Sequence, residues 1–247
     1  MNSEGSGRPA PRLAMRRTTI WFMLLAAAVA MAVGMTPGAR SSFADFERRV
    51  EAGDPEAMYR MSAILEKGFD SISADTLRSV ELLRRAARAG YPPAMNYLGF
   101  LHQSGNILPA NPDSAFYWIS RAADAGDPKA SHNLAYLLID RPAPDYEKAI
   151  LYLRNAADAG LPQAMTLLGT LYAEGRGLPA DTLRAQALFE EAIDHGFADA
   201  EVRLLNLRGH EWVMLSSEQL LPLAVEYWKR GADTIAAELL LHVAPDT

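Results

Sequence analysis

A motif of two small residues followed three positions later by a glycine recurs along this chain and constrains its fold. The copies are spaced by 36, 34 and 36 residues and lie at Ala86, Ala87 and Gly90, at Ala122, Ala123 and Gly126, at Ala156, Ala157 and Gly160, and at Ala192, Ile193 and Gly196. An alanine follows each glycine by four residues and a leucine by eight, and an aspartate or asparagine precedes each small pair by eleven. Because these markers stay in register, the chain is built from repeats.

Each repeat has the pattern of two helices. In the first, which we call helix A, Ala94, Leu98 and Leu101 are spaced as the apolar stripe of an amphipathic helix. The second, helix B, follows the aspartate or asparagine marker, whose side chain can accept hydrogen bonds from the free amides of the first turn. Asn111 followed by Pro112 fits this start, since proline is favoured at the first helical position. The glycine after helix B suits a left-handed C-terminal cap.

The small residues indicate how these helices pack. Alanine at positions such as Ala122 and Ala156 fits a close crossing between a helix B and the next helix A. One helix pair cannot bury its apolar stripes alone, whereas stacked pairs bury a continuous core. The sequence therefore predicts an all-α fold, an α-solenoid of stacked antiparallel helix pairs.

The repeat resembles the Sel-one-like repeat, a relative of the tetratricopeptide repeat. The fourth unit carries the pattern most fully, at Ala164, Leu168, Gly169, Tyr172, Gly175, Gly177, Asp181, Ala185, Ala192 and Gly196. The third unit departs from it, with residues 140–144 in place of the loop glycines. The resemblance covers roughly residues 44–208 and implies a right-handed solenoid of four to five units that binds protein partners without catalysis.

The N-terminal region predicts export from a bacterial cytoplasm. Residues 1–17 are basic, residues 18–36 form an apolar signal peptide or membrane anchor, and residues 37–42 form a linker. The apolar stretch lies between the lengths typical of a signal-peptide core and of a membrane helix, so cleavage and retention both stay open. The start of translation at Met1 or at Met15 also stays open.

The rest of the chain divides into a repeat array and a C-terminal cap. The array is expected at residues 43–208, and after Leu207 the markers are no longer found in register. Residues 209–247 are expected to form capping helices, one of which starts at a capping box from Ser216 to Gln219. Pro222 is expected to delay or kink that helix. Residues 239–241, three leucines, leave open an exposed docking site.

Composition disfavours several classes of function. The chain has no cysteine, which excludes disulfides, thiolate metal sites and catalytic thiols. The first forty residues hold five arginines and one glutamate, so the remainder carries 19 basic and 29 acidic residues, a net charge of −10. Such an acidic array is a poor ligand for nucleic acid. The five histidines are scattered, so no metal site, cofactor or catalytic residue is predicted.

The candidate site is the exposed face of the A helices, which lines the concave side in related repeats. The residues expected there as partner-binding are Tyr59, Asn96, Phe100, Gln103, His132, Tyr136, Thr166 and Thr170. Their aromatic rings beside amide groups suit binding of a protein or peptide segment. The alternative is that the same rings pack against neighbouring A helices.

These features predict a protein-binding scaffold or adaptor in the bacterial cell envelope, either soluble in the periplasm or anchored to the inner membrane by residues 18–36. Two alternatives stay open. One is an envelope hydrolase acting on cell-wall-like or β-lactam substrates, and the other is a structural subunit of a membrane complex. The partner and the oligomeric state cannot be derived from these patterns.

Overall fold

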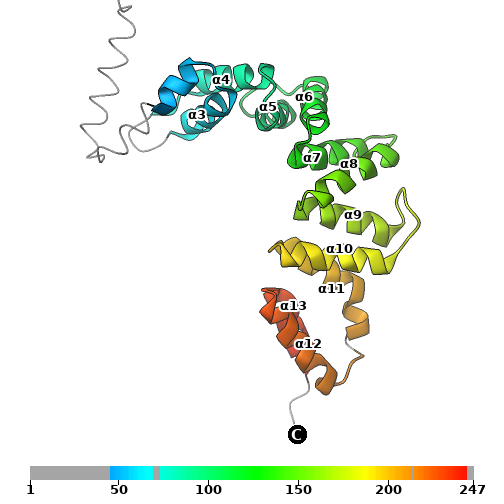
Figure 1. Ribbon diagram of the computed structural model, residues 1–247. Coiled ribbons are helices and arrows are strands. Elements are labelled where there is room, and N and C mark those ends of the chain that lie inside the picture. The colour runs from blue at the N-terminus through cyan, green and yellow to red at the C-terminus, as the bar shows by residue number, and fades with distance from the viewer. Residues whose placement is uncertain (1–44, 69–72, 213, 244–247) are drawn as a thin grey trace, which may run out of the picture. The chain divides into compact units, whose positions relative to one another are not determined.

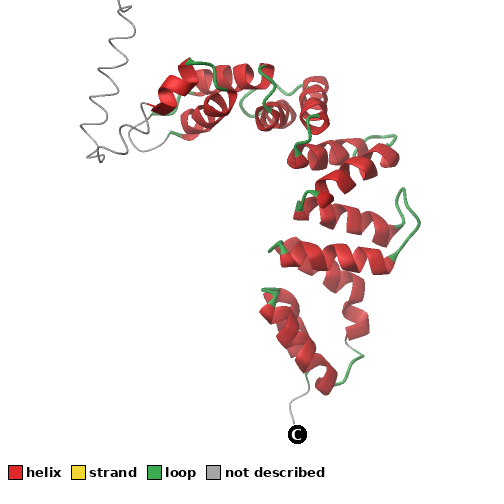
Figure 2. Ribbon diagram, in the orientation of Figure 1, coloured by secondary structure: helices red, strands yellow, loops and turns green. Residues whose placement is uncertain are grey.

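The computed structural model describes residues 45–68, 73–212 and 214–243, which are helical and contain no strand (Figures 1 and 2). A short helical segment at residues 45–51 comes first. The helices that follow are α3 (Pro55–Lys67), α4 (Thr76–Arg88), α5 (Pro92–Ser104), α6 (Pro112–Asp124), α7 (Pro128–Ile139), α8 (Tyr146–Asp158), α9 (Pro162–Glu174), α10 (Thr182–Asp194), α11 (Ala198–Trp212), α12 (Ser217–Lys229) and α13 (Asp233–Leu241). The prediction of an all-α array of helix pairs is confirmed.

The chain divides into two compact units, Met1–Leu82 and Leu83–Thr247, and α4 belongs partly to each. In the first unit, the helical segment at residues 45–51 buries Val50, as a terminal helix is expected to do. The hydroxyl of Ser79 on α4 donates to the backbone oxygen of Ser62 on α3 at 2.7 Å, and both serines are buried. This bond satisfies polar groups inside the contact between the two helices.

In the second unit, one kind of turn joins each helix B to the next helix A. Between α6 and α7, the amide of Gly126 donates to the oxygen of Ala123 at 2.9 Å, and the amide of Asp127 donates to that of Ala122 at 3.1 Å. These two bonds define a Schellman cap, and Gly126 has the positive φ, +85°, that such a cap requires. Asp127 then starts α7, because its carboxylate accepts from the amide of Ala130 at 2.7 Å.

The same turn recurs near the C-terminal end of the described residues. The amide of Gly231 donates to the oxygen of Trp228 at 3.0 Å, and the amide of Ala232 donates to that of Tyr227 at 2.9 Å. By this turn α12 is a further helix B and α13 a further helix A. The small pair of the motif is lost after Leu207 as expected, whereas the turn geometry recurs. The large residues at the two small-residue positions conceal the motif in the sequence.

The two C-terminal helices match one expectation from the sequence and depart from another. The backbone amide of Ser216 donates to the side-chain oxygen of Gln219 at 3.1 Å, as the predicted capping box requires. The helix starts at Ser217, so Pro222 does not delay it and lies inside α12. Four and eight residues after Gly231, α13 buries Ile235 and Leu239, the places that alanine and leucine occupy in the other repeats.

Within a repeat, helices A and B cross closely at a second glycine. A methyl group on Gly169 of α9 would lie 2.7 Å from Cε1 of Phe189 and 3.3 Å from the backbone oxygen of Ala185, both on α10. Gly99 of α5 is crowded by α6 in the same way. The equivalent residue of α7 is Ala135, which is fully buried, so that crossing accommodates a methyl group.

The N-terminal predictions fall on residues that the structure does not describe. The basic segment at 1–17, the apolar segment at 18–36 and the linker at 37–42 all lie outside the described ranges. Within those ranges, no helix combines the length and the apolar character needed to span a membrane.

Replacing Gly169 with alanine should lower the free energy of unfolding by about 1–3 kcal/mol, because the added methyl group must displace the ring of Phe189. The reverse change at the equivalent position, Ala135→Gly, should cost about 1 kcal/mol through helix propensity. Chemical denaturation followed by far-UV circular dichroism measures both. Unchanged or higher stability of Gly169→Ala would show that the α9–α10 crossing has room for a side chain.

Candidate functional site

The A helices of the second unit expose equivalent residues, because each begins at the same distance from its turn glycine. Ten residues after that glycine lie Phe100 on α5, Tyr136 on α7 and Thr170 on α9. Phe100 is 49% exposed and Tyr136 is 51% exposed, so each half-buried ring has a free side. We call the exposed surface of these three helices the helix A face; its predicted residues within this unit are Asn96, Phe100, Gln103, His132, Tyr136 and Thr170.

A row of polar side chains links two helices of the helix A face. The amide nitrogen of Asn133 on α7 donates to the amide oxygen of Asn96 on α5 at 2.9 Å. Nδ1 of His132 lies 3.3 Å from the side-chain oxygen of Asn133, which requires the proton on Nδ1. All three side chains are half-buried, so these bonds fix their positions. Burial lowers the pKa of His132, although its hydrogen bond to Asn133 acts in the opposite direction.

The structure places the predicted residues unevenly. Gln103 is exposed on α5, and Thr170 is half-buried with its hydroxyl bonded to the backbone oxygen of Thr166 at 2.9 Å. Thr166 was expected on the exposed face, and that expectation is wrong. Its hydroxyl donates to the oxygen of Pro162 at 2.9 Å, and the residue is only 5% exposed. Tyr59 lies on α3 in the first unit and is half-buried.

The sequence reasoning missed Asn133. It adjoins His132 on α7, and neighbouring residues on a helix usually point in different directions. Its side chain nevertheless carries the bond between α5 and α7. A spacing of 37 residues between two asparagines, close to the repeat length, is the signal that could have indicated it.

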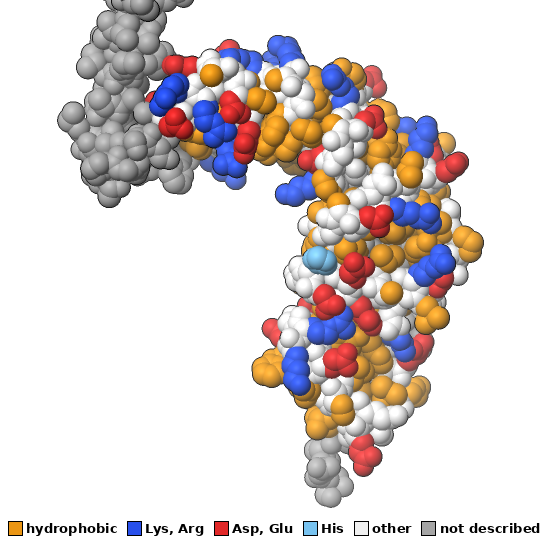
Figure 3. All heavy atoms as spheres, viewed as in Figure 1, with side chains coloured by type: hydrophobic (Ala, Val, Ile, Leu, Met, Phe, Trp, Pro, Cys, Tyr) orange, Lys and Arg blue, Asp and Glu red, His pale blue; other side chains and the backbone are white. Residues whose placement is uncertain are grey.

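A second exposed region lies on α12 and α13. A hollow of about 450 Å³ there is lined by Val225, Trp228 and Leu240, among others. Trp228 is 67% exposed and Leu240 is 50% exposed, and Figure 3 shows hydrophobic side chains over these two helices. Of the three leucines considered as a docking site, Leu239 is buried, whereas Leu240 and Leu241 are exposed.

A search against protein-family models finds four copies of one family in this chain. The Sel1 repeat model matches residues 55–91, 92–127, 128–161 and 162–197, which together exceed half of the chain. The chain belongs to the Sel1 repeat family. The resemblance drawn from the sequence markers is thus confirmed, and the turn at Gly231 extends the helix A and helix B alternation beyond the last match.

Several curated proteins share these Sel1 repeats. An uncharacterized Neisseria meningitidis protein is 29% identical over 175 residues, 70% of this chain and 36% of that protein. The Saccharomyces cerevisiae chitin synthase regulator SKT5 is 32% identical over 142 residues, 55% of this chain and 20% of its own length. The Pseudomonas aeruginosa alginate biosynthesis protein AlgK is 36% identical over 110 residues, 43% and 23% of the two chains. This chain thus spans a minor part of these relatives.

Two solved structures share the fold. One is a protective antigen of uropathogenic Escherichia coli, with a TM-score of 0.65 and 22% identity over 89% of this chain and 51% of that chain. The other is a Sel1 repeat protein of Oxalobacter formigenes, with a TM-score of 0.64 and 20% identity over 91% and 84% of the two chains. Both confirm a Sel1 solenoid.

The helix A face combines aromatic and polar side chains. It offers two aromatic rings, fixed amide groups and an imidazole, which can pack on and hydrogen-bond to a peptide. In the described part of the chain, no three His, Asp or Glu side chains are grouped so as to hold a metal ion. Sel1 repeats are typically non-catalytic scaffolds for protein–protein interaction.

The lowered pKa of His132 predicts a pH dependence of stability. Between its folded pKa and the usual value near 6.5, the unfolded chain binds more protons, so stability should decrease as the pH falls below about 6.5. Denaturation midpoints measured from pH 7 to about pH 5 should fall more steeply for the parent protein than for His132→Gln. His195→Gln, at an exposed histidine, should behave as the parent does. Equal slopes for all three would show that His132 protonates without cost.

Proposed function

We propose that this protein is a non-catalytic adaptor of the bacterial cell envelope that holds a partner protein on the helix A face. The observation that carries the proposal is the pair of half-exposed rings, Phe100 and Tyr136, at the same position of adjacent repeats. Large aromatic side chains contribute much of the binding energy of protein interfaces. Their regular placement suits a partner segment that runs across successive A helices.

The fixed polar row beside these rings favours binding by a preorganised surface. Asn96, Asn133 and His132 are held by each other before any partner arrives. A partner therefore loses little free energy in ordering them. Donors and acceptors that remain free on these side chains can bond to the backbone of an extended segment.

The names of the relatives support a role beside a larger assembly. SKT5 is named a chitin synthase regulator and AlgK an alginate biosynthesis protein, so these relatives are linked to the making of a polysaccharide. We infer that this chain likewise serves an enzyme or complex rather than acting on a substrate itself. The envelope location rests on the basic and apolar N-terminal segments of the sequence.

A structural subunit of a membrane complex is the second candidate function. The observation that favours it is the apolar hollow on α12 and α13, with Trp228 and Leu240 exposed. Exposed apolar patches of this kind are typical of interfaces. In that case the partner would remain bound when the helix A face is altered.

The double variant Phe100→Ala, Tyr136→Ala should retain the fold and lose its partner. Affinity capture of the full-length protein from detergent-solubilised native envelopes is expected to recover a stoichiometric partner with the parent. Recovery should fall by about tenfold or more with the variant, since two aromatic contacts are removed.

The matched control is Leu151→Ala, Leu183→Ala, which removes two exposed apolar side chains from the B helices α8 and α10. It should capture the partner as the parent does. Capture that survives the loss of Phe100 and Tyr136 would reject the helix A face. If capture is instead lost with Trp228→Ala, the structural-subunit function is favoured.

A further inference from the structure

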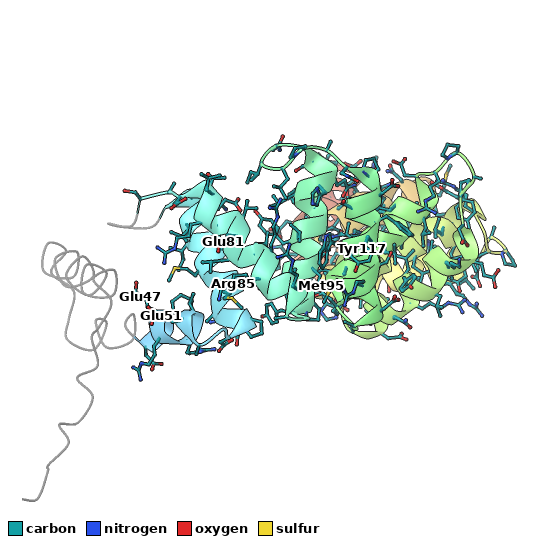
Figure 4. All side chains as sticks on the ribbon, turned by 90° about the horizontal axis from the view of Figure 1, so that it is seen from above. Glu47, Glu51, Glu81, Arg85, Met95 and Tyr117 are labelled. Atoms are coloured by element: carbon teal, nitrogen blue, oxygen red, sulfur yellow. The ribbon has the colours of Figure 1, made fainter. Side chains whose placement is uncertain are left out.

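A hollow of about 500 Å³ lies beside α6, a B helix, and is not part of the helix A face. Phe116, Tyr117, Ser120 and Arg121 line it from α6, and Arg141 reaches it from the loop between α7 and α8. Figure 4 shows Tyr117 on α6, and its side chain is 52% exposed. The hollow therefore combines aromatic surface with two positive charges.

Neither arginine of this hollow is ion-paired with a carboxylate of the described residues. The guanidinium carbon of Arg141 lies 4.3 Å from the centre of the Phe116 ring. Arg121 donates to the hydroxyl of Tyr117 at 3.0 Å and lies over its ring. An arginine that stacks on a ring keeps N–H donors at its edge, where they can bind a carboxylate in bidentate fashion.

In the next repeat, the loop arginine has both an ion-pair partner and a hydrogen-bond partner. Arg176, between α9 and α10, pairs with Glu174 at 3.1 Å and donates to the hydroxyl of Tyr146 on α8 at 2.9 Å. Gly177 follows it, and even a methyl group there would overlap Tyr146, so this loop lies tightly on α8. Residues 140–144 contain no glycine. Among the described residues, no hydrogen bond or ion pair is found for the side chain of Arg141, which lines the hollow.

Two further groups bear on what the hollow can hold. Ser120 lines the hollow, and its buried hydroxyl oxygen has no hydrogen-bond partner among the described residues. A buried hydroxyl without a partner is costly. Asp113 is the one acidic side chain lining the hollow, so the two guanidinium groups leave it with net positive charge.

We propose that this hollow binds an acidic peptide segment of a partner protein. A carboxylate of the segment binds Arg121 and Arg141, and an adjacent apolar side chain packs on Phe116 and Tyr117. Charge complementarity favours this occupant at short range, since at physiological salt charges more than about 8 Å apart are largely screened. A nucleic acid would extend beyond the hollow over the surface of a chain whose net charge beyond residue 40 is −10, whereas a single carboxylate meets only the two arginines.

The test is fluorescence anisotropy of the full-length protein in an uncharged detergent with a labelled peptide. The probe is a blocked five-residue peptide that alternates aspartate with phenylalanine and leucine, and its counterpart has asparagine at each aspartate. The aspartate peptide should bind at least about tenfold more tightly, and its affinity should fall as salt is added. Equal binding of the two peptides would overturn the proposal.

Amino-acid substitutions test whether the peptide binds in the hollow beside α6. The double variant Arg121→Gln, Arg141→Gln should weaken binding by about tenfold or more, and Asp113→Asn should tighten it, because it removes the opposing charge. Lys129→Gln, at an exposed cation of α7 outside the hollow, should change affinity by less than about twofold. Full affinity in the double variant would reject the site, and so would binding of an oligothymidylate instead of the peptide.

Binding of the acidic peptide in the hollow should not depend on the helix A face. The variant Phe100→Ala, Tyr136→Ala should bind the acidic peptide as the parent does, because α6 and the loop after α7 are unchanged in it. Loss of peptide binding in that variant would contradict a separate site. The proposals for the helix A face and for the hollow can therefore be confirmed or rejected separately.

Discussion

The array depends on the turn that ends each helix B and starts the next helix A. Its two hydrogen bonds are backbone to backbone, from the glycine and its successor to the last turn of helix B. This turn requires a positive φ at the glycine, and φ is +85° at Gly126 and +75° at Gly231. Because the same turn sets the direction of every helix A, residues at one distance from the glycine repeat along one surface. The helix A face follows from this register.

Most of the fold could be predicted because its signals are local. Asn111 and Pro112 start α6 as expected, with the asparagine oxygen accepting from the amide of Ser114 at 2.9 Å. The C-terminal register could not be predicted in the same way. The turn at Gly231 needs only backbone atoms, so larger side chains can replace the small pair: Tyr227 is buried with its ring 5.7 Å from that of Trp212 on α11, and Trp228 is exposed. A pattern of side chains then disappears while the backbone geometry that it marked persists.

The candidate site was predictable only where exposure follows from helix position. Phe100 and Tyr136 hold that position, and both are half-exposed. Thr166 did not follow the rule, because a threonine hydroxyl can bond to the oxygen four residues earlier, at Pro162, and withdraw from solvent. The bond between Asn96 and Asn133 depends on how two helices are placed in space. No single-helix pattern contains that information.

Positions where the sequence departs from the repeat pattern say more about a ligand site than the shared positions do. The loop of the fourth unit keeps its glycines and lies tightly on α8. Its Arg176 donates to the hydroxyl of Tyr146 and pairs with Glu174. The loop of the third unit lacks them, and its Arg141 stacks on Phe116 without a hydrogen-bond partner among the described residues. The shared residues of a Sel1 repeat fix how helices stack, and they are therefore poor guides to a partner. A repeat acquires its own ligand where a packing residue is replaced and a polar group loses its internal partner, which is the situation beside α6.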